Sequence, residues 1–141
     1  MTRDEIIAEA RRYKDPITPW RHRGRTRTGL DCAGLLCVVC DAFDHPYQDD
    51  DTYGRMPDGN RFVEHLKAQF VLAEGPLRPG MIVVLRDGPL PCHCGILGED
   101  RYGRLTLIHS SVQRRGVAEE LWDDHWARTF RCALEFKGIE D

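Results

Sequence analysis

Three residues of this chain, Cys32, His93 and His109, have the types and spacing that nucleophilic catalysis requires. Cys32 stands where a helix is expected to begin, and a helix N-terminus favours the thiolate through its unpaired N–H groups and partial positive charge. His93 and His109 lie in two strand-like segments separated by a turn centred on Glu99 to Gly103. An antiparallel hairpin would make these histidines neighbours. A thiol beside a base that a second polar group orients is an activated cysteine nucleophile.

The cysteine depends on a helix to hold it. The segment from Asp31 to Phe43 is apolar on almost all sides, which predicts a buried central helix with Asp31 as its N-cap and Cys32 in its first turn. Apolar residues recur at helical spacing from Asn60 to Phe70, so another helix is expected there. Between these two helices, residues 44–58 include consecutive aspartates at 49–51 and predict an exposed acidic loop.

The N-terminal segment predicts an amphipathic helix followed by a loop. Residues Thr2 to Tyr13 carry an apolar stripe, with Thr2 as the expected N-cap and Glu5 three residues later. A proline after Asp15 ends this helix. The run from Pro16 to Gly29 contains prolines, glycines and alternating arginines, a composition that is typical of an ordered loop.

The second half of the chain changes from helical to strand periodicity. Strands are expected at Met81–Leu85, His93–Leu97, Leu105–His109, Val112–Val117 and Arg128–Phe136, with a short helix around Glu119–Trp126 before the last of them. The gaps between successive strands suit hairpins rather than crossover helices, so the sheet is expected to be antiparallel. Helices followed by strands predict the α+β class, with the cysteine-bearing helix packed on the sheet.

Length and composition restrict the class of protein. The chain has 141 residues and a formal charge of 20 − 23 = −3, which suits a single domain over residues 1–141. Its longest uncharged apolar run, Cys32 to Cys40, has nine residues, about half of what a membrane-spanning helix needs. The first residues lack the apolar core of a signal peptide, so we expect synthesis in the cytoplasm and no membrane insertion. A net charge near zero argues against a nucleic-acid binder.

Three motifs taken together resemble one enzyme family. The runs Gly29–Leu35, His93–Gly98 and Ile108–His109 resemble the NlpC family of papain-like peptidoglycan endopeptidases, and the resemblance covers most of the chain. The runs Thr18–Arg25 and Tyr53–Gly59 look most like the version carried by phage tails and phage-derived particles. This second resemblance implies action at the cell wall from a virion or similar particle, with phage tail proteins as partners.

The resemblance to the NlpC family implies a fold, a reaction and three roles. Cys32 is implied as the nucleophile, His93 as the general base and later general acid, and His109 as the polar group that orients His93. The implied fold is a variation on papain in which the cysteine-bearing helix packs against an antiparallel sheet. The implied reaction cleaves the peptidoglycan stem peptide, often between D-γ-glutamyl and a diamino acid, through a thioester acyl-enzyme and without a cofactor.

The expected oxyanion site departs from the pattern of the family. Relatives commonly have a tyrosine at the position of Trp20, which is 32 − 20 = 12 residues before the cysteine. An indole N–H can donate one hydrogen bond but does not reproduce the geometry or pKa of a phenol. The backbone N–H of Cys32, at the helix N-terminus, is therefore the first expected oxyanion donor. Ala33 stands where many relatives have a serine, a change that we expect to be tolerated.

Besides Trp20, the candidates for the oxyanion site or substrate cleft are Arg21, His22, Arg23, Arg25 and Asp31. These residues precede the cysteine directly, and His22 lies in the loop before the helix. Guanidinium groups there would bind carboxylates of an anionic stem peptide and favour the thiolate. A solvated basic surface is the alternative interpretation of these arginines.

Two other interpretations remain open. Cys37 with Cys40, or Cys92 with His93 and Cys94, could hold zinc. Cys37 and Cys40 would however face the core, and residues 92 and 94 would point to the sheet face opposite His93. We therefore expect no metal. A non-catalytic tail-tip or wall-binding module on the same fold is the other alternative, because the oxyanion position departs from the family pattern.

Overall fold

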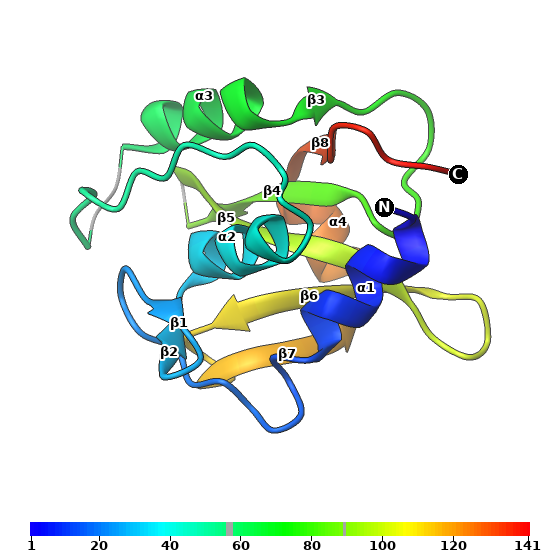
Figure 1. The fold of residues 1–141 in the computed structure, drawn as a ribbon, viewed down its shortest axis with the longest axis horizontal. Coiled ribbons are helices and arrows are strands. Elements are labelled where there is room, and N and C mark those ends of the chain that lie inside the picture. The colour runs from blue at the N-terminus through cyan, green and yellow to red at the C-terminus, as the bar shows by residue number, and fades with distance from the viewer. Residues whose placement is uncertain (56–57, 89) are drawn as a thin grey trace.

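The computed structural model describes residues 1–55, 58–88 and 90–141. The helices are α1 (Arg3–Arg11), α2 (Cys32–Ala42), α3 (Gly59–Gln69) and α4 (Asp124–Thr129). The strands are β1 (Arg25–Thr26), β2 (Gly29–Leu30), β3 (Val71–Leu72), β4 (Ile82–Asp87), β5 (Leu90–Glu99), β6 (Leu105–Ser111), β7 (Gly116–Leu121) and β8 (Phe130–Glu135). The predicted α+β class is confirmed (Figure 1). Met56 and Pro57, in the run that resembles phage-tail proteins, lie outside the described residues.

Six strands form one sheet in the order β3-β8-β4-β5-β6-β7, and each neighbouring pair is antiparallel. Alternation along a strand gives this sheet two apolar faces. On β4, Ile82 and Val84 pack in the core with residues of α1, α2 and α3. Val83 and Leu85 on the same strand pack on the opposite side, where Trp126 of α4 contributes. Figure 1 shows α1 and α2 in front of the sheet, α3 along the top of the view and α4 behind the sheet.

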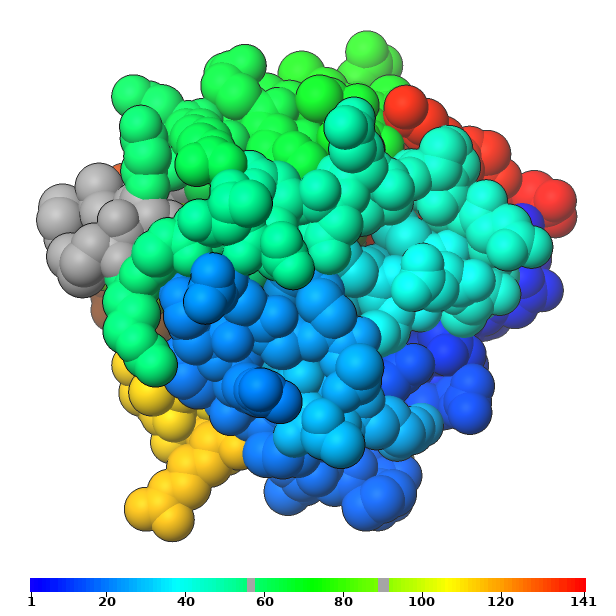
Figure 2. Space-filling model, turned by 60° about the vertical axis from the view of Figure 1, so that its left-hand side comes forward, coloured from blue at the N-terminus to red at the C-terminus, as the bar shows by residue number. Residues whose placement is uncertain are grey.

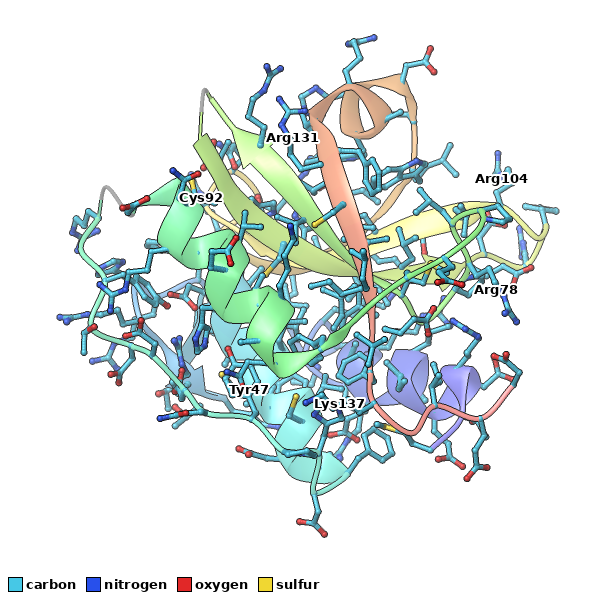
Figure 3. All side chains as sticks on the ribbon, turned by 90° about the horizontal axis from the view of Figure 1, so that it is seen from above. Tyr47, Arg78, Cys92, Arg104, Arg131 and Lys137 are labelled. Carbon is cyan, nitrogen blue, oxygen red and sulfur yellow. The ribbon has the colours of Figure 1, made fainter. Side chains whose placement is uncertain are left out.

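The central helix α2 forms as its sequence predicts. Asp31 is the N-cap and Cys32 is the first helical residue, and every residue from Ala33 to Cys40 is buried. Side chains of α2 and α3 fill the space between these helices and the sheet (Figure 3). This packing fixes the start of α2, and therefore the cysteine, against the strands.

One close approach holds the N-terminal loop to α2, and it accounts for a glycine in the cysteine motif. A Cβ atom added at Gly34 would lie 2.0 Å from the carbonyl oxygen of Gly24.

We expect Gly34→Ala to lower the free energy of unfolding by about 2 kcal/mol or more, because a clash with backbone forces the loop to move. Urea unfolding would measure this loss. Gly54→Ala is the matched control, since a Cβ there meets nothing within 4 Å, and equal midpoints for both variants would contradict the expectation.

The last third of the chain corrects two sequence predictions. The strand expected at Val112–Val117 is instead β7 at Gly116–Leu121, and residues 112–115 form a turn in which Arg115 has a positive φ of 63°. The helix expected at Glu119–Trp126 was also wrong at its start, because α4 begins only at Asp124. The glutamates lie in β7, where Glu119 and Glu120 alternate between the sheet faces and each pairs with basic residues of other segments.

The N-terminal half agrees more closely with prediction. Thr2 caps α1 and forms a capping box with Glu5. The run predicted as an ordered loop, Pro16 to Gly29, also contributes to the small β1–β2 hairpin. No helix among the described residues is both long and apolar enough to cross a membrane.

Candidate active site

Cys32 is placed by the N-terminus of α2. Its N-cap, Asp31, is buried and accepts a hydrogen bond from the backbone N–H of Gly34 at 2.8 Å. The Asp31 carboxylate also accepts hydrogen bonds from the Arg25 guanidinium, at 2.9 Å, and from the hydroxyl of Tyr53. As the first residue of the helix, Cys32 has a backbone N–H without an intrahelical partner. The thiol and this free N–H therefore lie together at the positive end of the helix.

The two histidines are neighbours, as the hairpin predicts. Strands β5 and β6 pair with Ile96 opposite Ile108, which puts His93 and His109 on one face of the sheet. The distance from His93 Nε2 to His109 Nδ1 is 2.8 Å. With Nε2 occupied in this way, His93 has Nδ1 available for the cysteine.

A glutamate that the sequence interpretation missed extends this series. His109 Nε2 lies 2.6 Å from a carboxylate oxygen of Glu120, whose other oxygen accepts a hydrogen bond from Arg114 at 2.8 Å. A carboxylate can only accept, so His109 Nε2 carries the proton and His109 Nδ1 accepts from His93 Nε2–H. The proton positions in the whole series are thus fixed by one charged group, Glu120. Because side chains alternate between the two sheet faces along a strand, a strand at β7 would have placed Glu120 on the face of His109. The sequence analysis instead assigned this acidic segment to a helix.

The surroundings of Cys32 favour the thiolate. A hydrogen bond from the Cys94 thiol, followed by the hydrogen bond and charge of His93, lowers the pKa of Cys32 to about 6, although burial opposes the shift. Cys94 itself has a raised pKa, because it donates to Cys32 and is buried. Cys94 therefore stays protonated and serves as a hydrogen-bond donor to Cys32.

The two histidines are driven toward different protonation states. Burial lowers the pKa of His93, but the hydrogen bond and charge of Cys32 outweigh it and raise the pKa above the ordinary value. Burial and the charge of His93 lower the pKa of His109 to about 4, so His109 is neutral in the physiological range. A thiolate, an imidazolium and a neutral orienting imidazole are the charge states of a primed cysteine–histidine pair.

The thiol and His93 line one cavity of about 240 Å³ at the surface. Its walls come from three separate segments of the chain. Trp20 with His22, residues 53–55, and Ser110 with Val112 and Gln113 each contribute, and Figure 2 shows these blue, green and yellow segments meeting on one face. A cavity of this kind can receive a short extended segment of a larger substrate.

Comparison of the sequence and of the structure with known proteins identifies the fold of this chain. No protein-family model matches the sequence, and no curated protein matches it. The structure is similar to the crystal structure of the NlpC/p60 domain of the peptidoglycan hydrolase SagA, with a TM-score of 0.62 and 17% identity, over 96% of this chain and 100% of that one. This chain has the NlpC/p60 fold. The papain-like architecture predicted from the cysteine and histidine motifs is thereby confirmed.

Within this NlpC/p60 fold, two of the remaining candidates reach the cavity. Trp20 and His22 line it, with their ring centroids 6.5 Å apart, and His22 contacts Tyr53 edge to face at 5.7 Å. The three rings make one aromatic wall beside Cys32. Asp31 also lines the cavity, at the base of the helix.

The arginines lie elsewhere in the NlpC/p60 fold. Arg21 and Arg23 are exposed and do not line the cavity of the cysteine. Arg25 is bound on both sides, by Asp31 and by Asp49 at 2.9 Å each. Its guanidinium therefore supports the N-cap of α2 rather than facing a substrate, and the structure does not bring these arginines together at the thiol.

Two of the other cysteines have structural surroundings, whereas Cys92 lines the cavity of Cys32. Cys37 and Cys40 are buried in the core, where burial raises the pKa of Cys37 to about 12. Burial likewise raises the pKa of Cys92 to about 11. In the described ranges, no three His, Cys, Asp or Glu side chains are grouped so that they could hold a metal ion.

Proposed function

We propose that this protein is a cell-wall hydrolase, a cysteine peptidase that cleaves peptide bonds in peptidoglycan. The observation that carries the proposal is the hydrogen-bonded series from Glu120 through His109 to His93, which ends at a thiol whose pKa is lowered to about 6. Such a thiol is mainly thiolate at neutral pH and is a strong nucleophile. The described function of the similar structure, a peptidoglycan hydrolase, supports the choice of substrate.

The proposed mechanism has two steps. The Cys32 thiolate attacks the scissile carbonyl carbon, and the oxyanion of the tetrahedral intermediate accepts a hydrogen bond from the backbone N–H of Cys32. The imidazolium of His93 gives its Nδ1 proton to the leaving amine, and a thioester remains on Cys32. Neutral His93 then takes a proton from a water molecule, which attacks the thioester carbon. The C–S bond breaks, the product leaves with a new carboxylate, and the Cys32 thiolate and the His93 imidazolium are restored. His109 and Glu120 hold His93 in the required tautomer throughout.

Two more specific proposals concern which peptide bond is cut and how the protein reaches the cell wall. We propose the D-γ-glutamyl–diamino acid bond of the stem peptide as the scissile bond, and delivery on a phage tail or tail-like particle. The support for the scissile bond is the resemblance carried by the sequence motifs around Cys32 and His93, and the support for delivery is the resemblance of the runs Thr18–Arg25 and Tyr53–Gly59 to phage-tail proteins. The cavity of about 240 Å³ beside the thiol suits a stem peptide, which is narrow and extended.

Digestion of purified peptidoglycan tests the proposal directly. The protein is incubated with wall material, and the soluble fragments are identified by mass spectrometry. We expect fragments with a new amino group on the diamino acid and a new carboxylate on the D-glutamyl residue. Cleavage between sugars, or tight wall binding with no released peptide, would contradict the proposal and favour a lysozyme-like or a non-catalytic protein.

The role of Glu120 gives a separate prediction. Glu120→Gln keeps the side-chain volume but removes the charge that fixes the proton on His109, and its amide can donate to His109 Nε2 and favour the wrong tautomer. We expect kcat/KM to fall by about 10-fold to 1,000-fold, with KM little changed, because the residue does not contact substrate. Initial rates on a stem-peptide substrate measure this effect.

The neighbouring glutamate provides the matched control. Glu119 lies on the other face of β7, where it pairs with Arg11 and Lys14 at 2.8 Å each. Glu119→Gln is therefore expected to alter stability and leave kcat/KM nearly unchanged. Equal losses of activity in the two variants would show that the charge of Glu120 has no specific role.

A further inference from the structure

Two cysteines of β5 lie beside the nucleophile at the start of α2. Side chains alternate between the sheet faces along a strand, so Cys92 and Cys94 belong to the same face of β5. Val84, which pairs with Cys94 across the strands, packs in the core that α2 covers. Cys94 is a fully buried member of this core, and Cys32 packs against it. The fold therefore gathers three thiol-bearing residues at one end of α2.

The two cysteines of β5 meet the nucleophile in different ways. The Cys32 Sγ atom lies 4.0 Å from the backbone carbonyl oxygen of Cys92, whose side chain lines the catalytic cavity. The thiol of Cys94 instead hydrogen-bonds directly to the sulfur of Cys32. A hydroxyl would donate the same hydrogen bond, so the proposed peptidase mechanism does not require sulfur at position 94. A second sulfur in contact with the nucleophile allows a reaction between the two sulfurs.

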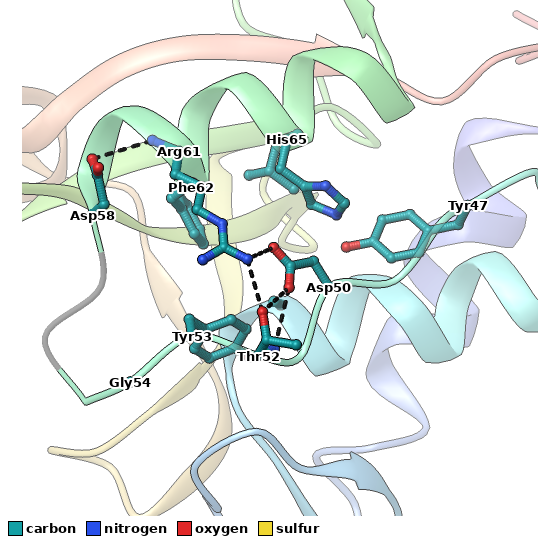
Figure 4. Close-up of a pocket in the computed structure, with 11 residues that line it drawn as sticks. Tyr47, Asp50, Thr52, Tyr53, Gly54, Asp58, Arg61, Phe62 and His65 are labelled. Carbon is teal, nitrogen blue, oxygen red and sulfur yellow. Dashed lines mark hydrogen bonds and ion pairs between the residues drawn. The ribbon is translucent and has the colours of Figure 1, made fainter.

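A small oxidant can reach Cys32 through the catalytic cavity. This cavity has a volume of about 240 Å³, and both Cys32 and Cys92 line it. The neighbouring cavity in Figure 4 has aromatic walls that include Tyr47 and Phe62, and no cysteine is among the described residues that line it. Of these two cavities, the catalytic one therefore leads an oxidant to a thiol. Peroxides react first with an accessible thiolate, which is the state that the surroundings of Cys32 favour.

We propose that Cys32 and Cys94 form a reversible disulfide when a peroxide enters the catalytic cavity, so that oxidation switches the nucleophile off and a thiol reductant restores it. The observation behind the pairing is the contact of the two sulfurs between β5 and α2. Formation of the disulfide does not depend on what the protein hydrolyses. Its effect on the cleavage of peptidoglycan rests on the proposed function.

The oxidation has two balanced steps. The Cys32 thiolate attacks one oxygen of hydrogen peroxide, an S–O bond forms, the O–O bond breaks, and the departing hydroxide takes a proton from the imidazolium of His93. The sulfur of Cys94 then attacks the sulfenic sulfur of Cys32, an S–S bond forms, the S–O bond breaks, and the departing hydroxide takes the proton of Cys94. The two sulfurs together lose two electrons, and the peroxide is reduced to two water molecules.

The charge of Cys32 controls when Cys94 becomes reactive. While Cys32 is a thiolate, its hydrogen bond and its charge act together with burial to raise the pKa of Cys94. A sulfenic acid is neutral, so oxidation of Cys32 removes the part of this increase that the thiolate causes. Cys94 is therefore protected while the nucleophile is active, and it loses its proton more easily once Cys32 is oxidised.

Mass spectrometry of the wild-type protein tests the disulfide without any peptidoglycan. The protein is treated with hydrogen peroxide, and its free thiols are blocked with N-ethylmaleimide in denaturant at mildly acidic pH, where disulfides exchange slowly. We expect a digest peptide in which Cys32 is linked to Cys94, and dithiothreitol should restore both thiols. A link from Cys32 to Cys92, or Cys32 found as sulfinic acid without any link, would overturn the proposal even if the protein hydrolyses peptidoglycan.

Two serine variants test which sulfur reacts with the oxidised nucleophile. Cys94→Ser keeps a hydrogen-bond donor beside Cys32 but removes the second sulfur. After prolonged treatment with excess peroxide, dithiothreitol should recover at least about tenfold less Cys32 thiol from this variant than from the wild type, because an unprotected sulfenic acid continues to the sulfinic acid. Cys92→Ser is the matched control, since Cys92 lies on the same strand and lines the same cavity, and it should show the recovery of the wild type.

Equal recovery from Cys94→Ser and the wild type, or an equal loss in Cys92→Ser, would contradict the assignment of Cys94. Circular dichroism would establish that both variants are folded, and the linkage found in the wild type does not depend on either of them.

Peptide release from peptidoglycan tests the consequence for activity separately. Peroxide should abolish release by the wild type, and dithiothreitol should restore it. Full activity of protein that carries the Cys32–Cys94 link would overturn the switch. A link that forms in protein without any hydrolytic activity, even when reduced, would leave the disulfide established and contradict the proposed function instead.

Discussion

Cys32→Ala is expected to abolish the release of peptides from peptidoglycan, with a loss of at least about 10⁴-fold in kcat, as is typical when a catalytic nucleophile is removed. Three nearby or buried thiols cannot replace it, because Cys94 keeps its proton in a hydrogen bond to Cys32 and the thiols of Cys37 and Cys92 have pKa values raised by burial. Initial rates of amino-group release measure the loss. Circular dichroism would establish that the variant is folded.

Cys132 offers the matched control for this substitution. It is a half-buried free thiol on β8, outside the catalytic cavity, and it contacts the edge of the core. Cys132→Ala should keep nearly the full rate. Substantial hydrolysis by the Cys32→Ala protein would contradict the assignment of the nucleophile.

His93→Gln is the second substitution with a large expected effect. Glutamine can hydrogen-bond to His109 but cannot take or give the proton that attack and amine departure require. It also removes the charge and hydrogen bond that raise the thiolate fraction of Cys32. We expect kcat/KM to fall by about 10³-fold or more, since both general acid–base catalysis and thiolate formation are lost.

Another histidine controls for the loss of an imidazole. His125 is exposed on α4 and contacts Trp126 edge to face, with ring centroids 4.7 Å apart, but does not line the cavity of Cys32. His125→Gln should retain the wild-type rate within a factor of about two, the range usual for a surface substitution. A His93→Gln protein as active as this control would exclude His93 as the base.

Most of the fold around the nucleophile could be predicted from sequence because its determinants are local. An aspartate followed by an apolar segment specifies an N-cap and a buried helix, and α2 begins at Cys32 as predicted. The proximity of His93 and His109 follows from the β5–β6 hairpin. A hairpin with a short turn is also specified by residues that are close together in the sequence.

The contributions that the sequence analysis missed depend on contacts between distant segments. Glu120 was assigned to a helix, because a run of acidic residues is compatible with either element until the strand partners of β7 are known. Arg25 was expected to face substrate, yet it binds Asp49 from the loop between α2 and α3, and this pairing spans 24 positions. Cys94 was considered as a zinc ligand, and its hydrogen bond to Cys32 arises only when β5 and α2 meet.

The rate of alkylation of each cysteine as a function of pH tests the central claim most directly. A thiolate reacts and a thiol does not, so reactivity is present above the pKa of the group and is lost as the pH falls through it. The structure predicts that iodoacetamide labels Cys32 with a midpoint near pH 6, whereas burial keeps Cys37 and Cys92, with pKa values of about 12 and 11, almost unlabelled at neutral pH. Mass spectrometry of the digested protein assigns the label to each residue. Labelling of Cys32 with a midpoint near the ordinary value of 9.0, or uniform labelling of all six cysteines, would contradict a primed nucleophile at the start of α2.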